Sequence, residues 1–159
     1  MITVLAGRDG QHRLEDATGR RVGWVRGRAI GFRGMRSVDE VMATAVVAWP
    51  RLEAALGRHY FGRPPQEPVR GPLRLAHDGA YEWVTDGQRP LARLHRPLSD
   101  VGDGEFAIEF VLPSYATEGV AVAVAQAVGL AIRSHLSQAV DAVSGGPSER
   151  FPADAAASA

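Results

Sequence analysis

The residues of this chain that could do chemistry gather first in an arginine-rich stretch near the N-terminus. Two aromatic side chains, Trp24 and Phe32, stand among arginines at positions 20, 21, 26, 28, 33 and 36. Cations interleaved with aromatic planes are what single-stranded nucleic-acid binders present on the face of a sheet. This pattern gives one binding hypothesis, in which nucleic acid contacts Arg21, Trp24, Arg26, Arg28, Phe32 and Arg33. The same alternation of aromatic and small residues also fits side chains that face a core.

Metal and nucleophile chemistry find little support in the residue types. The chain has no cysteine, which removes thiolate zinc sites and cysteine nucleophiles and fits a reducing compartment. Its five histidines, at positions 12, 59, 77, 95 and 135, show no metal-ligand spacing with an acidic partner. The chain contains neither a Gly-x-Ser-x-Gly elbow nor a phosphate loop that ends in lysine. We therefore predict no catalytic residue, no metal and no cofactor.

A second candidate site lies in the segment 108–136, where a predicted strand leads into a predicted helix. Residues 111–113 close the strand, and residues 119–121 open the helix. Locally the segment resembles the acetyl-CoA-binding strand–loop–helix of the GNAT acetyltransferase superfamily. Tyr115-Ala116-Thr117-Glu118 is also similar to the start of that helix in ribosomal-protein acetyltransferases. The resemblance implies that the pyrophosphate of a CoA-like cofactor would bind at the helix N-terminus, on Thr117, Glu118 and Gly119.

The formal net charge is zero, so no overall field draws the protein toward nucleic acid or a membrane. Residues 1–96 nevertheless carry 16 arginines against 10 acids, and residues 97–159 carry 2 against 8, so the two ends should attract each other. The longest apolar stretch, 119–132, is interrupted by Gln126 and is shorter than the roughly 20 residues that span a bilayer. The N-terminus has no signal-peptide pattern. We expect a cytoplasmic protein that does not contact a membrane.

The elements that must position these residues begin with short strands. Runs favourable to β-structure at 2–6, 11–15, 21–25 and 29–32 are separated by turn signals at Asp9-Gly10, at 16–19 and at 26–28. A capping box formed by Ser37 and Glu40 then begins a helix, whose apolar residues recur every three or four positions as far as Leu56. Pro50 lacks the N–H that would bond to Val46, so we expect a kink or a break there.

The second half repeats this plan after a connector at 63–72 that contains four prolines. Strands are predicted at 73–77, 80–85 and 89–94, joined by the hairpin signals Asp78-Gly79 and Asp86-Gly87. A further strand alternates apolar residues from Phe106 to Leu112. A helix capped by Ser114 or Thr117 then runs to about Leu136 or a turn beyond. The composition from residue 144 onward predicts a disordered tail, 144–159.

Together these elements predict one α+β domain over residues 1–143. Its core is a mostly antiparallel sheet of six or seven strands with two main helices on one face. The half-units 1–62 and 73–143 share a meander-plus-helix plan, which indicates a structural duplication. The second helix is apolar over more of its circumference than one sheet would cover. We therefore hypothesise a non-catalytic, self-associating module, a homodimer that binds protein or ligand, with acetyl-CoA binding and single-stranded nucleic-acid binding as alternatives.

Overall fold

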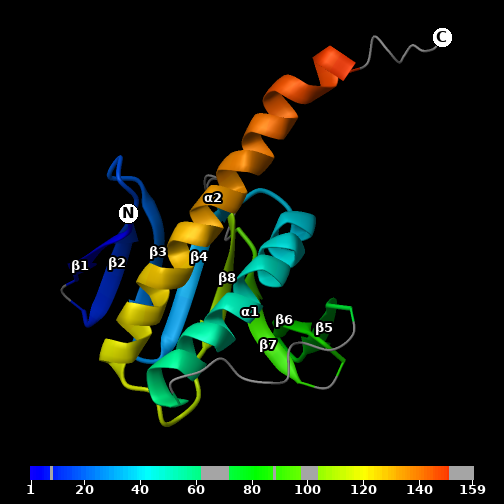
Figure 1. Ribbon diagram of the computed structural model, residues 1–159. Coiled ribbons are helices and arrows are strands. Elements are labelled where there is room, and N and C mark those ends of the chain that lie inside the picture. The colour runs from blue at the N-terminus through cyan, green and yellow to red at the C-terminus, as the bar shows by residue number, and fades with distance from the viewer. Residues whose placement is uncertain (8, 62–71, 88, 98–103, 151–159) are drawn as a thin grey trace.

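The fold is one eight-stranded antiparallel sheet with two helices, so the α+β prediction is confirmed with slightly more strands than expected (Figure 1). The computed structural model describes residues 1–7, 9–61, 72–87, 89–97 and 104–150. The elements in chain order are β1 (Thr3–Ala6), β2 (Gln11–Glu15), β3 (Arg21–Arg26), β4 (Ala29–Met35), α1 (Val38–Phe61), β5 (Arg74–Asp78), β6 (Tyr81–Thr85), β7 (Pro90–His95), β8 (Phe106–Val111) and α2 (Glu118–Arg150).

The strand order repeats one plan in the two halves of the chain. The sheet runs β1-β2-β3-β4-β8-β7-β6-β5, so each half is a four-stranded meander followed by a helix, and the last strands of the two meanders meet in the middle. At this seam Ile30 pairs with Phe110 and Phe32 pairs with Ile108. Most of the predicted connector lies outside the described residues. The duplicated plan is thus present in the order of the strands as well as in the sequence pattern.

The predicted hairpin turns are confirmed. The Asp78-Gly79 step joins β5 to β6, and Asp86-Gly87 lies between β6 and β7. Gly79 and Gly87 have φ angles of 63° and 96°, in the left-handed region that a glycine adopts without a steric penalty. The turn residues therefore set these two strand reversals locally.

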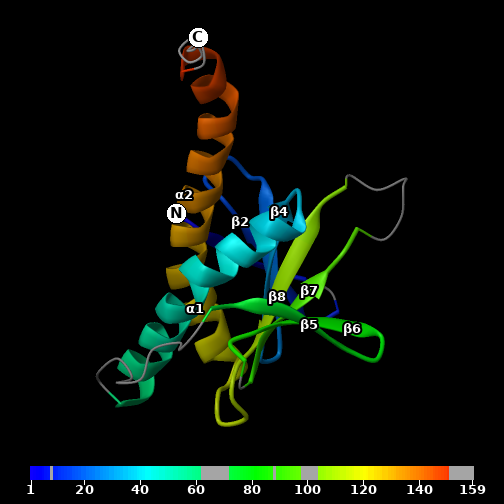
Figure 2. The same cartoon turned by 90° about the vertical axis from the view of Figure 1, so that its right-hand side faces the viewer.

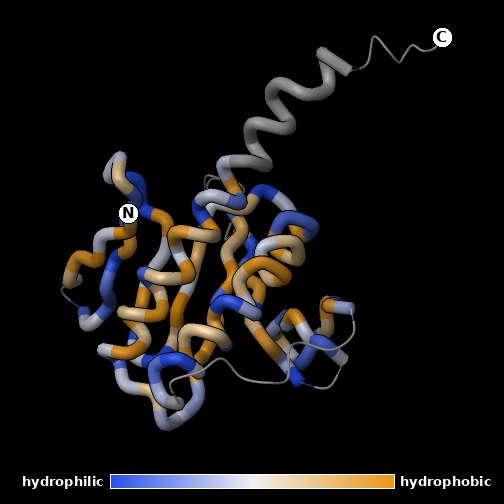
Figure 3. The backbone as a smooth tube through the Cα atoms, viewed as in Figure 1, coloured by the Kyte–Doolittle hydropathy of each residue, from blue (hydrophilic) through white to orange (hydrophobic). Residues whose placement is uncertain are grey.

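Both helices cover the same face of the sheet, as Figure 2 shows from the side. Hydrophobic residues follow the central strands and the helices packed on them (Figure 3). α2 packs against β3, β4 and α1, and Val124, Val128 and Ile132 are buried there. Among the described side chains of α2, Leu130 is the large apolar one that stays exposed, at 51 %. By its sequence, α2 is apolar over more of its circumference than one sheet would cover. α1 covers much of that additional apolar surface.

α1 is a single helix, so the structure does not contain the break at Pro50 that was one of the two expectations. Its predicted cap is present, because the N–H of Glu40 donates to Ser37 Oγ at 3.1 Å. The N–H of Arg36 donates to the Glu40 carboxylate at 2.9 Å. Val46, whose carbonyl loses the N–H of residue 50, lies on the exposed side of α1, where water can bond to that carbonyl.

α2 continues to Arg150, beyond its expected end near Leu136, and its last turns project away from the sheet and α1 (Figures 1 and 2). The helix thus includes residues 144–150 of the segment predicted as a tail, and 151–159 lie outside the described residues. Gly145, Gly146 and Pro147 in this segment have poor helix propensity. Extending an existing helix needs no new nucleus, so such residues can still be helical.

By length and composition, Glu118–Ser137 within α2 is apolar enough to cross a membrane, with a mean hydropathy of 1.4. The sequence pattern placed the longest apolar stretch at 119–132, whereas this stretch has the roughly 20 residues that a bilayer requires. However, 44 % of the stretch is buried inside the domain, and a core helix passes the same test.

One substitution tests the close packing of β3 against β4. A Cβ at Gly23 would lie 2.1 Å from the carbonyl oxygen of Gly31, which is backbone and cannot swing away. We expect Gly23→Ala to lower the free energy of unfolding by about 1–3 kcal/mol, as overpacking does. Urea denaturation followed by circular dichroism would measure the change.

Gly119→Ala is the matched control. A Cβ there meets nothing closer than Thr117 Oγ1 at 3.9 Å, and the position is helical. Its effect should stay within about 1 kcal/mol of zero, on the stabilising side. Equal losses for the two variants would contradict the packing assigned to Gly23.

Candidate anion-binding pocket

The turn between β2 and β3 is built around the carboxylate of Asp16. Asp16 Oδ1 accepts hydrogen bonds from the Thr18 hydroxyl at 2.7 Å and from the N–H groups of Thr18 and Arg20, both at 3.0 Å. Gly19 completes the turn with a φ of 84°. The turn predicted at 16–19 is thereby confirmed, and it places Arg20 and Arg21 side by side at the entrance to β3.

The same carboxylate ties the turn to α2. Arg133 Nε donates to Asp16 Oδ2 at 2.9 Å, a contact between residues 117 positions apart. Asp16 is only 8 % exposed. Hydrogen bonding, first from the Thr18 hydroxyl and then from the Arg20 N–H and Arg133, outweighs burial and lowers the pKa of Asp16 to about 2. The carboxylate is therefore ionised at neutral pH and holds Arg133 beside the turn.

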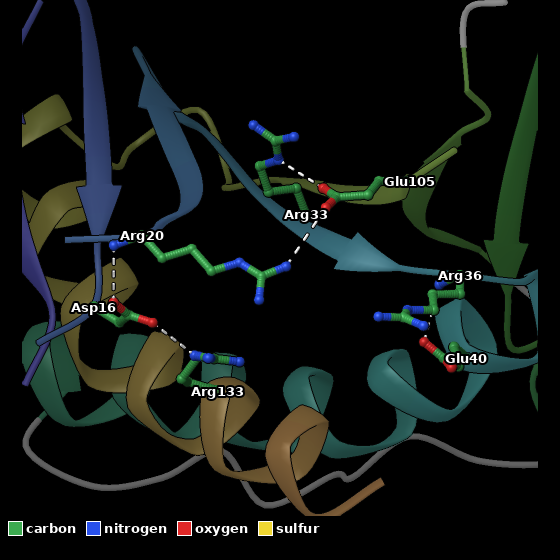
Figure 4. A network of polar contacts seen from close by, with 7 residues as sticks. All are labelled: Asp16, Arg20, Arg33, Arg36, Glu40, Glu105 and Arg133. Carbon is green, nitrogen blue, oxygen red and sulfur yellow. Dashed lines mark hydrogen bonds and ion pairs between the residues drawn. The ribbon is translucent and has the colours of Figure 1, made fainter. Parts of the chain in front are cut away.

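Five arginine side chains border one small hollow of about 50 Å³. They come from the β2–β3 turn and β3, from β4, from the residue before the cap of α1, and from the middle of α2. Figure 4 shows four of them, Arg20, Arg33, Arg36 and Arg133, around the same space. The complete lining is Arg20, Arg21, Val22, Arg33, Gly34, Arg36, Glu40, Arg133 and Leu136. A hollow of this size holds a few waters, or one phosphate or carboxylate group.

The charges around this arginine pocket do not cancel. Glu105 lies 2.9 Å from Arg33 and 3.6 Å from Arg20, and Asp16 pairs with Arg133. Counted over the described residues, and with Glu40 included, three carboxylates stand against five guanidinium groups, an excess of two positive charges. In the part of the chain that the structure describes, Arg21 and Arg36 make no ion pair. Guanidinium groups hydrogen-bond oxyanions in a planar fork, so a small oxyanion complements this pocket.

The residues proposed for nucleic-acid binding are separated by the fold. Arg21 and Arg33 line the arginine pocket. Phe32 is 1 % exposed and packs edge-on to Phe110, so its ring is in the core and not free to stack on a base. Arg28 donates to the carbonyl of Leu112 at 2.8 Å.

Trp24, another residue proposed for nucleic-acid binding, lies on the face of the sheet opposite the helices. Arg26, also proposed, is exposed at the end of the same strand, β3. The indole of Trp24 covers Gly31, where a Cβ would come within 2.0 Å of the ring. It meets His95 edge-on at 6.0 Å, and its N–H donates to Glu109 at 3.4 Å. His95 Nε2 lies 3.0 Å from Glu109, and hydrogen bonding to that imidazole lowers the pKa of Glu109. Trp24 thus belongs to a local aromatic and polar cluster on the uncovered face.

The residues that the acetyltransferase resemblance picked out cap α2. Thr117 Oγ1 accepts from the N–H of Val120 at 3.2 Å. Glu118 Oε2 lies 3.5 Å from His12 Nε2. A cap and a carboxylate of the chain itself therefore occupy this helix N-terminus beside Gly119, and the carboxylate would repel a pyrophosphate. Within the described residues, no group of three or more His, Asp and Glu side chains could hold a metal ion.

Reasoning from the sequence did not single out Arg133 as a site residue. A signal was available, because Arg133 is the only arginine or acid between Glu118 and Asp141, in an otherwise apolar helix. A lone charge on such a helix needs a partner or an opening to solvent. Here it has both, in Asp16 and the arginine pocket.

Comparison of this chain with protein-family models, with curated proteins and with solved structures gives no match.

The low pKa of Asp16 has a consequence for stability in acid. The folded-state pKa, about 2, lies below the ordinary value of 3.8, so ionised Asp16 stabilises the fold. This stabilisation should be complete above about pH 4 and should fall as the pH drops toward 2. Asp16→Asn should be less stable at pH 7 and should lack this part of the pH dependence, measured by urea denaturation from pH 2 to 7.

Asp9→Asn serves as its control, because Asp9 is exposed in a hairpin turn where Asn-Gly is equally suitable. That variant should keep the acid dependence of the parent chain. If the free energy of unfolding of Asp16→Asn falls between pH 4 and pH 2 as much as that of the parent chain, the role given to this carboxylate is contradicted.

Proposed function

We propose that this chain is a non-catalytic interaction domain that binds the phosphate group of a ligand or partner in its arginine pocket. The observation that carries the proposal is the convergence of five arginines from both half-units on one hollow. They are Arg20, Arg21, Arg33, Arg36 and Arg133. Bringing like charges together is unfavourable unless an anion or acidic side chains compensate, and the acidic side chains here compensate only in part.

The size and charge of the pocket favour phosphate over a single carboxylate. A surplus of two positive charges matches a phosphate dianion, whose several oxygens can accept from more than one guanidinium group. The capped N-terminus of α1 borders the hollow and adds a partial positive charge. The one carboxylate in the lining, that of Glu40, accepts the hydrogen bond from the N–H of Arg36, which supports a binding role rather than acid–base chemistry.

Titration with inorganic phosphate, followed by calorimetry and by the thermal midpoint, tests the proposal. We expect saturable binding that raises the midpoint, because a ligand that binds only the folded state stabilises it. Arg36→Gln and Arg21→Gln remove guanidinium groups that hold no partner within the described residues. Each should weaken phosphate binding by about tenfold, with little loss of stability.

Arg58→Gln is the matched control. Arg58 is an exposed arginine in the last turn of α1, at the opposite end of the helix from Arg36. This variant should leave phosphate binding unchanged. If phosphate does not bind, or if Arg58→Gln weakens binding as much as Arg36→Gln, the pocket is not the site. Acetate in a parallel titration should bind more weakly than phosphate.

Self-association is the second candidate, and the exposure of Leu130 favours it. This side chain is 51 % exposed on the helix whose end projects beyond the domain. If α2 pairs with a second copy, Leu130→Glu should convert a dimer into a monomer in light scattering across a concentration series. Val46→Glu, at an equally exposed apolar position on α1 (58 %), should leave the mass unchanged. A parent chain that is monomeric at all concentrations would exclude the dimer.

A further inference from the structure

A second pocket, of about 300 Å³, lies between the C-terminal half of α1, the β6–β7 turn and the segment joining β8 to α2. It is lined by Trp49, Leu52, Glu53, Leu56, Gly57, Arg89, Val111, Pro113 and Tyr115, none of which borders the arginine pocket. Its volume is at the lower end of the range for small-molecule sites. It is therefore a separate candidate for ligand binding.

The internal duplication places the two pockets at equivalent positions. The arginine pocket forms where β4 leads into α1, against the turn before β3 and the side of α2. The second forms where β8 leads into α2, against the turn before β7 and the side of α1. Each turn is also tied to the opposite helix by an ion pair, Asp16 with Arg133 in one case and Arg89 with Glu53 in the other. The charges of the turn and the helix are reversed between the two.

The walls of the second pocket are aromatic and aliphatic. The Trp49 indole stacks on Phe110, with centroids 6.0 Å apart and an interplanar angle of 29°, so its position is fixed by the core. Leu52 and Leu56 are buried beside it on α1. On the open side, Val111 and Tyr115 are each 54 % exposed. An apolar ligand body would cover these two side chains.

The polar end of the pocket holds an ion pair between sheltered acids and an exposed base. Arg89 Nη2 lies 3.2 Å from Glu53 Oε2, and Arg89 Nε lies 3.6 Å from Asp86 Oδ2. The side chains of Glu53 and Asp86 are 16 % and 5 % exposed, whereas that of Arg89 is 51 % exposed. Two sheltered carboxylates thus face one guanidinium group that reaches solvent.

The Arg89 guanidinium also lies 5.5 Å from the centroid of the Trp49 ring, within the range of a cation–π contact. The pocket therefore already accommodates a cation between an aromatic face and a carboxylate. Burial raises the pKa of Glu53, and the charge of Arg89 opposes this effect. A positive charge beside Glu53 therefore favours the ionised form of this carboxylate.

We infer that this pocket binds an organic amine, with its apolar body over Val111 and Tyr115 and its ammonium group between Glu53 and the Trp49 ring. The ammonium group takes the place of Arg89, which turns outward into solvent. The inference does not depend on phosphate binding, because the two pockets share no residue.

2-Phenylethylamine is the probe, titrated by calorimetry into the full chain at pH 7, with 2-phenylethanol and 3-phenylpropionate as its neutral and acidic counterparts. We expect the amine to bind at least about tenfold more tightly than the alcohol, because only the ammonium makes a charge-assisted bond to Glu53. Glu53→Gln should remove that preference. Arg89→Gln should strengthen amine binding, since it removes the internal cation that competes for the same place.

Arg93→Gln is the matched control, because Arg93 likewise covers an aromatic ring, that of Tyr81 at 3.8 Å, but outside this pocket. It should leave amine binding unchanged. Tighter binding of 3-phenylpropionate that is lost in Arg89→Gln would overturn the inference and make the pocket a carboxylate site. Failure of all three probes to bind a chain with a native circular dichroism spectrum would also overturn it.

Discussion

The pairing of β4 with β8 is the contact on which the rest of the structure depends. It joins two meanders that would otherwise each end in an unpaired strand, and it places Ile30, Phe32, Ile108 and Phe110 side by side beneath the helices. Because the two strands are antiparallel, the helices that follow them begin at opposite ends of the sheet. The start of each helix therefore lies beside the later part of the other. This crossing closes the core on the covered face.

The same crossing creates both pockets. At each strand–helix junction the backbone turns away from the sheet, and the opposite helix and a neighbouring turn complete the walls. At the β4–α1 junction, Arg36 lines the arginine pocket together with Arg133 of α2. At the other, the hydroxyl of Tyr60 near the end of α1 reaches the carbonyl of Tyr115 at 3.4 Å. Duplication of a fold thus gives two sites of similar construction, whose lining residues can differ in charge.

The two sites differ in the charge of their lining residues as well as in volume. One pocket gathers five guanidinium groups, and an acidic turn residue, Asp16, anchors the helix arginine. The other is mainly apolar, and a turn arginine, Arg89, is anchored by the helix acid Glu53. With a net charge of zero, the chain has little long-range field, so recognition depends on such local imbalances. Neither turn–helix ion pair joins an arginine of the basic segment 1–96 to an acid of the segment 97–159. The ion pairs of Arg20 and Arg33 with Glu105 do so.

The sequence by itself determined the local elements of this protein. Asp-Gly steps marked the hairpins, Ser37 and Glu40 marked the start of α1, and alternation marked β8, because each of these features depends on residues a few positions apart. The α+β class and the duplicated plan followed from their order. The sequence did not reveal how far α2 extends, since helix propagation through residues 145–147 is not set by propensity alone.

Only the tertiary structure decided which side chains meet. The sequence did not show which face of the β3–β4 hairpin is turned toward solvent. The pairing of its strands in the sheet places Phe32 in the core and Trp24 on the uncovered face. The arginine pocket joins Asp16 to Arg133 across 117 positions, and the second pocket joins Glu53 to Arg89 across 36. Such contacts form when the β4–β8 seam and the crossing helices bring distant segments together. Local periodicity carries no information about that closure, because it reports which face a residue occupies and not what lies opposite that face.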